Sequence, residues 1–363
     1  MSPRKNLITL TPVLICVFLA AGCSSMSSST DSAGQQSANK SVVLVDGDSN
    51  GYITYDTDRE VLTGYTSGGT RKWRESRYFP TDVHCAGSCP NAVVSATADT
   101  NENESGTHTV WKTADSSTVR SFPDKSLIVH WAMNKDTWVA TSETSIIWSD
   151  AGKTHTKKFG KGLTDSLGRV SADDSTLVIS VQPASAASWS AFRFPLKSKN
   201  LSPSEISTDL PGSVGCLSPE QGTMWTLGNK AYEFDLATGK KIREVSQYSS
   251  DCASSRKSTV IGAFSAGTDE ASQHIAITSA GASAPLRSVE VESDGEIGVF
   301  QDCGVLLSNG RLATLSSTGR KTETEIDAHS ALTVPDGRVY SVGPSGKVER
   351  HTATADGQGC AIR

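Results

Sequence analysis

Short segments of alternating apolar and polar residues recur along the chain from Ser41 onward. Four clear examples are Asn50–Asp56, Lys230–Asp235, Arg311–Leu315 and Arg338–Val342. An apolar residue at every second position predicts a strand with one buried face. The last three examples are each followed by a turn that contains glycine, a residue that tolerates backbone conformations closed to other side chains. No long amphipathic helical pattern interrupts the series, so the predicted fold class is all-β.

The repeats predict a β-propeller. Further units lie near Val110, Ile146, Phe192 and Ile275, which brings the expected number to eight. Dividing the roughly 320 residues after the N-terminal region by eight gives roughly 40 residues per unit, the length that a four-stranded blade needs. Eight blades are therefore expected. The spacing is uneven, with only 27 residues from Gly319 to Gly346, so seven blades remain an alternative.

Two repeats carry a family resemblance. The segment Tyr232–Lys241 is similar to the aromatic, Asp, Thr-Gly-Lys pattern of PQQ-like repeats, and Val43–Asp56 resembles the inner hairpin of that family. Arg243 stands where the pattern ends in Trp, and the Gly-to-Trp spacing is kept only in Gly69–Trp73. In addition, Ile146–Thr154 resembles the Asp-box hairpin of sialidase-like propellers. The resemblance implies the propeller architecture, and we expect no quinone or other cofactor because no cofactor-holding motif accompanies it.

The N-terminus resembles a bacterial lipoprotein signal. Arg4 and Lys5 precede the apolar stretch Leu7–Ala21, and Cys23 follows the small residues Ala21 and Gly22. The resemblance implies a signal peptide over residues 1–22, lipidation of Cys23 and attachment to the cell membrane on its extracytoplasmic side. An ordinary secretory signal with an incidental cysteine is the alternative.

The residues after Cys23 predict a tether followed by one domain. Residues 23–40 are rich in serine and contain no aromatic residue, a composition that does not form a core. We expect a flexible tether there and a single propeller domain over residues 41–363. The net charge of −5 excludes nucleic acid as a partner, so the expected membrane contact is through the lipid. We expect the domain to be monomeric.

Six cysteines remain after Cys16 and Cys23, and an even number in an exported protein predicts disulfides. The six allow 15 pairings, of which we favour the nearest-neighbour set. The candidates are Cys85 with Cys89, Cys216 with Cys252, and Cys303 with Cys360. A zinc site at His84, Cys85 and Cys89 is the alternative for the first pair. The third pair would hold the C-terminus, while residues 42–45 would add an N-terminal strand to the final blade and close the ring.

Residues 46–53 follow the first positions of a calcium-binding loop. Asp46, Asp48 and Asn50 occupy the first, third and fifth ligand positions. The twelfth position, which needs a bidentate Glu, is Thr57. The same residue types are favoured in a β-hairpin turn, which is the interpretation we prefer.

The expected function is binding rather than catalysis. No nucleophile elbow or zinc-protease motif is present, so the sequence names no catalytic residue. Trp131 and Trp138 flank a loop-like stretch and are the predicted exposed pair for binding. The resemblance implies a binding or scaffold module for a cell-envelope protein or glycan. A carbohydrate-active hydrolase or lyase is the alternative, suggested by the Asp-box.

Overall fold

The computed structural model describes most of the chain from Ser41 to the C-terminus. The described residues are 41–76, 78–85, 87–98, 107–112, 120–121, 127–134, 136–171, 173, 175–198, 200–245, 248–255, 258–264, 273–279, 287–291, 297–316, 318–334, 336–356 and 359–363. The predicted signal peptide, the lipidated Cys23 and the tether lie outside this range. The described part of the chain contains no helix long and apolar enough to span a membrane.

The described residues form eight four-stranded antiparallel sheets, which we call blades 1 to 8 in chain order. Blade 1 contains β1 (Val42–Gly47), β2 (Gly51–Asp56), β3 (Val61–Thr66) and β4 (Arg71–Ser76). Blade 2 contains β5 (Tyr78–Cys85), β6 (Ala92–Ala98), β7 (Thr107–Lys112) and β8 (Arg120–Ser121). Blade 3 contains β9 (Ile128–Asn134), β10 (Thr137–Ser142), β11 (Ser145–Asp150) and β12 (Lys153–Lys158). Blade 4 contains β13 (Leu163–Val170), β14 (Thr176–Pro183), β15 (Trp189–Pro195) and β16 (Ser204–Leu210).

The second half of the chain repeats this arrangement. Blade 5 contains β17 (Ser213–Ser218), β18 (Thr223–Leu227), β19 (Ala231–Asp235) and β20 (Lys241–Val245). Blade 6 contains β21 (Tyr248–Ser254), β22 (Ser258–Phe264), β23 (Gln273–Ser279) and β24 (Arg287–Val291). Blade 7 contains β25 (Ile297–Phe300), β26 (Cys303–Ser308), β27 (Arg311–Leu315) and β28 (Lys321–Asp327). Blade 8 contains β29 (Ser330–Thr333), β30 (Arg338–Val342), β31 (Val348–Asp356) and β32 (Gly359–Ile362).

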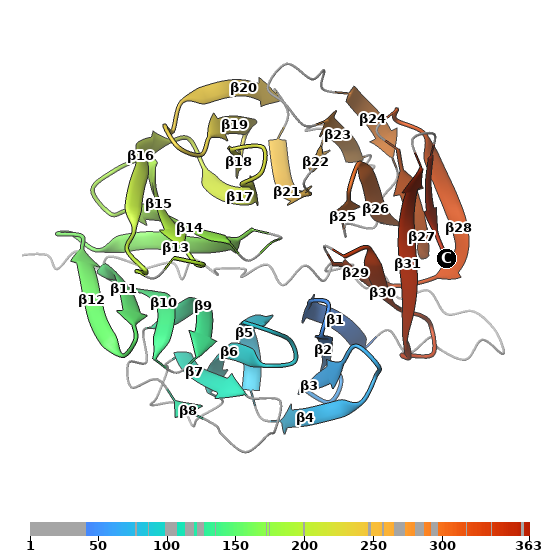
Figure 1. Ribbon diagram of the computed structural model, residues 1–363, viewed down its shortest axis with the longest axis horizontal. Coiled ribbons are helices and arrows are strands. Elements are labelled where there is room, and N and C mark those ends of the chain that lie inside the picture. The colour runs from blue at the N-terminus through green and yellow to red at the C-terminus, as the bar shows by residue number, and fades with distance from the viewer. Residues whose placement is uncertain are drawn as a thin grey trace, which may run out of the picture.

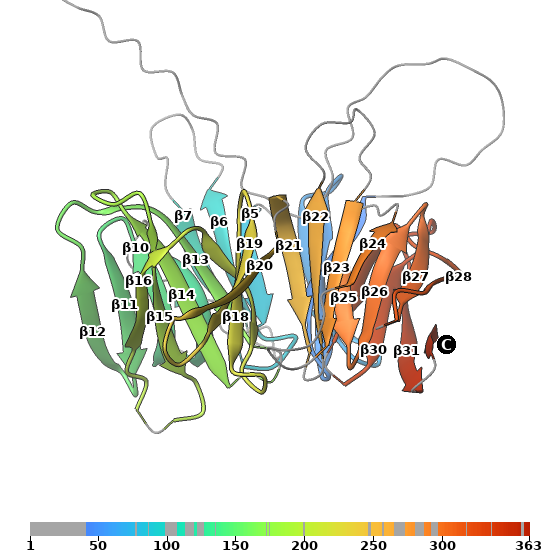
Figure 2. The ribbon, with the colours of Figure 1, turned by 90° about the horizontal axis from the view of Figure 1, so that it is seen from above.

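The blades form a closed ring (Figure 1). The first strand of each blade contacts the first strands of both neighbouring blades, and β29 of blade 8 contacts β1 of blade 1. Seen from the side, the strands run across the thickness of a disc (Figure 2). The fold is therefore an all-β propeller, as the alternation of apolar and polar residues predicted.

The ring closes without the expected exchange of a strand. Blade 8 takes all four of its strands from the C-terminal part of the chain, and β1 pairs with β2 in blade 1. The prediction that residues 42–45 join the final blade was wrong. The physical reason is that the tight turn at residues 48–50 places β1 directly beside β2, where the two strands pair at a small cost in loop entropy.

The uneven repeat spacing comes from the place of the glycine turn within a blade. Gly239 and Gly319 lie in turns between the third and fourth strands of blades 5 and 7, whereas Gly346 lies between the second and third strands of blade 8. The 27-residue interval thus compares two different turns, and no blade is missing from it.

The three expected disulfides are present. Cys85–Cys89 closes a short loop after β5, Cys216–Cys252 joins the first strands of blades 5 and 6, and Cys303–Cys360 joins β26 of blade 7 to the final strand of blade 8. Because Cys85 and Cys89 are bonded to each other, neither is available as the thiolate ligand that the zinc alternative requires.

In blade 5, Arg243 occupies the position at which the PQQ-like repeat pattern has Trp. It lies opposite Glu233 in the register of β19 and β20, and its Nε donates a hydrogen bond to Glu233 Oε2. The Glu233 side chain is only 2 % exposed, and the Arg243 guanidinium lies 5.6 Å from the centre of the Trp225 ring. A buried ion pair over an indole ring therefore covers this part of the blade.

Candidate functional site

A groove of about 590 Å³ lies between blade 1 and blade 8, at the point where the ring closes. All four strands of blade 1 contribute to its lining, together with the turn between β30 and β31 of blade 8. The groove thus brings together residues near the two ends of the propeller domain.

Successive side chains along β2 and β3 face blade 2 and blade 8 in turn, and those that face blade 8 line the groove. Ile53, Tyr55 and Leu62 point toward blade 2 and join the hydrophobic cluster between blades 1 and 2. The intervening residues, which include Thr54 and Thr63, therefore face blade 8. These two threonines lie opposite each other in the register and line the groove. Their hydroxyl groups make its floor polar.

Three tyrosines pack together at the contact between blades 1 and 8, and two of them, Tyr52 and Tyr65, line the groove. The Tyr52 ring stacks on Tyr65 with centroids 5.1 Å apart, and it meets the Tyr340 ring of blade 8 at 4.8 Å. Burial, together with the neighbouring Tyr65 and Tyr340, raises the pKa of Tyr52 to about 12. Tyr52 is therefore a neutral phenol at physiological pH, and its ring joins the two blades by apolar contact.

The lining is cationic although the chain as a whole is acidic. Arg59, Arg71, Arg74 and Lys347 line the groove, against the single carboxylate of Asp56. Arg59 lies 3.6 Å from Asp56. Within the part of the chain that the structure describes, the side chains of Arg71, Arg74 and Lys347 have no ion pair or hydrogen bond. Elsewhere on the described surface some lysines are paired, such as Lys157 with Glu205 at 2.8 Å, while others, such as Lys153 and Lys158, have no partner among the described residues.

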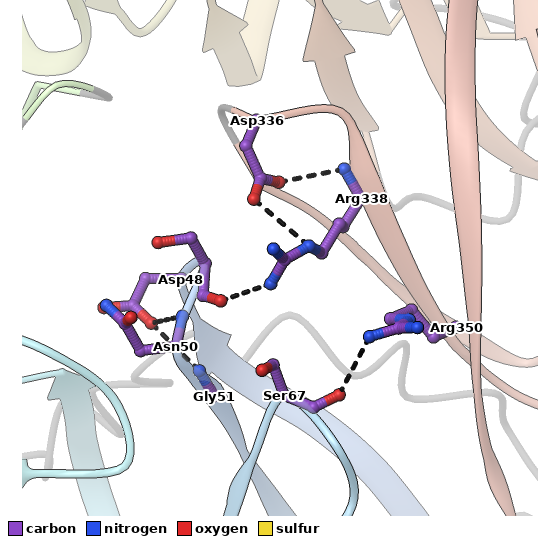
Figure 3. Close-up of polar contacts among 8 residues, drawn as sticks. Asp48, Asn50, Gly51, Ser67, Asp336, Arg338 and Arg350 are labelled. Atoms are coloured by element: carbon purple, nitrogen blue, oxygen red, sulfur yellow. Dashed lines mark hydrogen bonds and ion pairs between the residues drawn. The ribbon is translucent and has the colours of Figure 1, made fainter.

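Two arginines of blade 8 hold the adjoining turns of blade 1 in place (Figure 3). Arg338 lies 3.2 Å from Asp336 and donates a hydrogen bond to the carbonyl of Ser49 in the β1–β2 turn. Arg350 donates to the carbonyl of Ser67 in the β3–β4 turn at 3.4 Å. These contacts order one side of the groove because each connects a guanidinium of blade 8 to backbone of blade 1.

The residues of the calcium hypothesis form a hairpin turn. Asp48 Oδ1 accepts hydrogen bonds from the amides of Asn50 and Gly51, at 2.7 and 3.1 Å (Figure 3). Its Oδ2 accepts one from the amide of Cys89 at 2.9 Å, while Asp46 Oδ2 accepts one from the amide of Cys85 at 2.6 Å. Both carboxylates thus bind backbone amides of blade 2. Among the described residues, no group of three or more His, Cys, Asp or Glu side chains is placed to hold a metal ion.

The predicted tryptophan pair is not an exposed surface. Trp131 is 6 % exposed and belongs to a hydrophobic cluster with residues of blade 4. Trp138 is half-buried and packs against a different cluster within blade 3. In the register, Trp138 lies opposite Ala132 and Trp131 opposite Val139, so the two rings project from opposite faces of the blade. The prediction failed because Trp131 and Trp138 lie within the paired strands β9 and β10, where the Trp131 indole packs toward blade 4 and the Trp138 indole packs within blade 3.

Sequence reasoning missed the cationic residues of the groove. A signal was present in the segment Arg71–Arg74, which has three basic residues in four positions of an acidic chain. Arg59 and Lys347 gave no such signal, because single cations in turns are common on exposed surfaces.

The groove is suited to binding a polar or anionic ligand. Guanidinium groups form paired hydrogen bonds with carboxylates and phosphates, and threonine hydroxyls both donate and accept. Hydrolysis of a glycosidic bond normally needs two carboxyl groups, and the described residues of the lining contain one.

Comparison with known proteins agrees with the architecture. BamB from Moraxella catarrhalis superposes with a TM-score of 0.51 at 13 % identity, over 85 % of this chain and 92 % of that one. The computationally designed protein Ika8 has a TM-score of 0.52 at 12 % identity, over 85 % of this chain and 96 % of the design. Oligopeptidase B from Leishmania major has a TM-score of 0.53 at 11 % identity, over 86 % of this chain and 52 % of its own length. At these identities the similarity establishes the β-propeller fold alone. No protein-family model matches the chain, and no curated protein matches it by sequence.

Proposed function

We propose that the protein is a lipid-anchored β-propeller on the extracytoplasmic side of the cell membrane, where it serves as a binding or scaffold module for an envelope protein or glycan. The groove between blades 1 and 8 carries this proposal, because three of its cationic side chains have no partner in the described part of the chain. A ring of packed sheets provides a rigid frame for such a groove, and a lipid on Cys23 would hold it near the envelope components.

The lipid anchor is tested by the Cys23→Ser variant. The expected result is that wild-type protein incorporates labelled palmitate and fractionates with membranes, while the variant does neither. Labelling of the variant, or release of the wild-type protein in soluble form, would contradict the anchor.

The binding function is tested by cross-linking the anchored protein in cells and identifying the attached molecules by mass spectrometry. The expected result is one stoichiometric envelope component, which the double variant Arg71→Glu/Arg74→Glu no longer captures. The matched control is Lys153→Glu/Lys158→Glu, which reverses two exposed charges on β12, the outermost strand of blade 3. Capture that is unaffected by the groove variant would contradict the groove as the site, and capture of nothing would contradict the binding function.

A further inference from the structure

We infer that the groove between blades 1 and 8 binds an acidic oligosaccharide, a short chain of sugars that carry carboxylate groups. This inference rests on the proposed binding function and names the ligand class of the same site. Three features of the groove support it. Two buried hydroxyl groups lie on its floor, a bulge places two arginines on the same face, and the sheet offers a ligand side chains instead of free backbone groups.

The floor carries two buried hydroxyl groups. Thr54 and Thr63 lie opposite each other in the register of β2 and β3, and they are 5 % and 7 % exposed. Both line the groove, and in the described part of the chain neither hydroxyl has a hydrogen-bond partner. A buried hydroxyl without a partner costs free energy, which a ligand recovers by donating to it or accepting from it. The floor therefore favours a ligand rich in hydroxyl groups, such as a sugar.

A bulge in β4 brings two arginines to the face that carries these threonines. Tyr65 lies opposite Arg71 and Thr63 opposite Arg74, with a register shift that leaves Lys72 as an extra residue of β4. Residues three positions apart on a regular strand point to opposite faces, whereas the bulge lets both guanidinium groups line the groove. The two arginines therefore occupy adjacent rows of the groove face, about 7 Å apart along β3.

This common face distinguishes the arginines from other exposed cations. Lys153 and Lys158 of β12 also have no partner among the described residues, but their unbroken register places them on opposite faces of an outermost strand. Arg71 and Arg74 instead share the groove with Lys347 of the opposite blade. Because a guanidinium binds a carboxylate by two parallel hydrogen bonds, the groove favours a ligand with more than one carboxylate.

The length of the groove favours a chain over a single sugar. Tyr52 and Asp56 lie at its two ends along β2, about 13 Å apart for four residues of a strand. The volume of about 590 Å³ is in the range of known ligand sites. Tyr65 is half-buried, and its ring provides an apolar surface for the CH groups of a sugar. A single acidic sugar would leave part of this lining uncovered.

The face of the sheet favours a sugar over an extended peptide. β2 pairs with β1 and β3, and β3 pairs with β2 and β4, so the backbone groups of the floor are used within blade 1. A peptide that binds as an added strand needs free amides and carbonyls, which the floor does not offer. Hydroxyl and carboxylate groups of a sugar need only side-chain partners, and the groove supplies both kinds.

The test uses a short oligogalacturonate labelled with fluorescein at one end, and the same oligosaccharide with its carboxylates methyl-esterified. Fluorescence anisotropy with the purified full chain is expected to show that the acidic form binds, less tightly as salt is raised, and that the ester binds weakly. The variant Arg71→Gln/Arg74→Gln should weaken binding by about tenfold, as expected for two exposed charge-assisted contacts, and should reduce the salt dependence. The control Lys153→Gln/Lys158→Gln should change neither.

The variant Thr54→Val/Thr63→Val tests the floor. Valine has nearly the shape of threonine, and neither hydroxyl has a described partner to lose, so the protein is expected to keep its stability. Binding of the oligogalacturonate should weaken while its salt dependence stays the same, because no charge has changed. Unchanged affinity would contradict the inference, since the ligand would then not contact the floor.

Other outcomes also overturn the inference. Absence of binding, or equal binding of the ester, would exclude recognition of a carboxylate-bearing sugar. Binding that the arginine variant does not weaken would place the ligand elsewhere. Free galacturonate that binds as tightly as the oligomer would reduce the site to one sugar. Tighter binding of a peptide of alternating Glu and Thr, with displacement of the oligogalacturonate, would assign the groove to an acidic protein segment. In that case the cross-linking experiment would still capture an envelope component, so failure of this inference is distinguishable from failure of the proposed function.

Discussion

Several buried charged and polar side chains among the described residues are bound by partners in the neighbouring strand or blade. Glu233 is paired with Arg243 across one register position, and His130 is linked to Thr141 at 2.8 Å, which in turn is linked to Ser166 at 2.7 Å. Removing one member of such a set leaves the other desolvated without compensation. Two predictions follow from this arrangement at the scale of the residue.

The first concerns the Arg243–Glu233 pair. The variant Arg243→Met should lower the free energy of unfolding by about 3 to 5 kcal/mol, because it leaves the Glu233 carboxylate buried and unpaired. The double variant Glu233→Leu/Arg243→Met should recover most of that loss, since no isolated charge remains. Denaturant unfolding of the three proteins measures both effects. A double variant no more stable than the single one would show that packing, and not charge, is what Arg243 supplies.

The second concerns pH. Burial lowers the pKa of His130 to about 3, with smaller contributions from His84 and Arg169. The ordinary pKa of histidine is 6.5, so between about pH 6.5 and 3 the unfolded chain binds a proton that the folded protein does not. Stability is therefore lost as the pH falls, by up to about 1.4 kcal/mol per pH unit from this group.

Unfolding free energies of wild type and His130→Gln between pH 4 and pH 6 measure this effect. The wild-type slope should be steeper than that of the variant, whereas the contribution of His351, whose pKa burial also lowers, is common to both. Parallel slopes would show that another group causes the acid sensitivity.

At the scale of the element, turns and disulfides define the blades. Ala151 and Gly152 both have positive φ, at 48° and 83°, as do Asn309 and Gly310 at 53° and 71°. Two successive residues with positive φ make the type I′ turn, whose twist matches that of antiparallel strands. The Asp-box-like segment is thus a tight hairpin between β11 and β12, and Leu201 donates its amide to the Asp150 carboxylate at 3.2 Å.

A disulfide should contribute more to stability the longer the loop that it closes, because the entropy lost by the unfolded chain grows with the logarithm of loop length. Replacing Cys303 and Cys360 with Ala opens a loop with a sequence separation of 57, and the expected loss is about 4 kcal/mol. Replacing Cys85 and Cys89 opens a separation of 4, and the expected loss is about 2 kcal/mol. Guanidinium unfolding of the two double variants provides the comparison. A larger loss from the short loop would show that its contacts with the β1–β2 turn outweigh chain entropy.

At the scale of the whole molecule, hydrogen bonds between side chains of blade 8 and backbone groups of blade 1, and not a shared strand, join the two ends of the ring in the described part of the chain. The Leu44 amide donates to Ser330 Oγ at 3.0 Å, and His329 Nε2 donates to the Val42 carbonyl at 2.8 Å. The hydrogen bonds of Arg338 and Arg350 and the apolar group around Tyr52 and Tyr340 also join these two blades. Because no strand is exchanged between blades 1 and 8, this interface is the expected place for the ring to open.

The variant Tyr340→Ala tests that expectation. Tyr340 is fully buried, and truncating so large a side chain costs about 3 to 5 kcal/mol. Hydrogen exchange should show loss of protection in β1 and β29 before the other first strands. Tyr232→Ala in blade 5, which removes a half-buried ring far from the closure, is the control and should not alter exchange in β1. Uniform loss of protection in Tyr340→Ala would show that the ring unfolds as one unit.

Most features predicted correctly from the sequence depend on residues close together in the chain. Alternation in segments such as Lys230–Asp235 predicted strands, and the glycines after them predicted turns, because both are properties of a few consecutive residues. The disulfide pairs also joined neighbouring cysteines. By contrast, Trp131 and Trp138 were misassigned, since the face on which each indole lies depends on the register of β9 and β10.

The sequence by itself determined the all-β class, the hairpins and the expectation of a propeller. Only the tertiary structure decided how the ring closes, what the carboxylates of Asp46 and Asp48 bind, and that a cationic groove exists. The physical reason is the distance along the chain: Arg74 and Lys347 line one groove although nearly the whole domain separates them in sequence. Local patterns set the strands, whereas the packing of the first blade against the last creates the site.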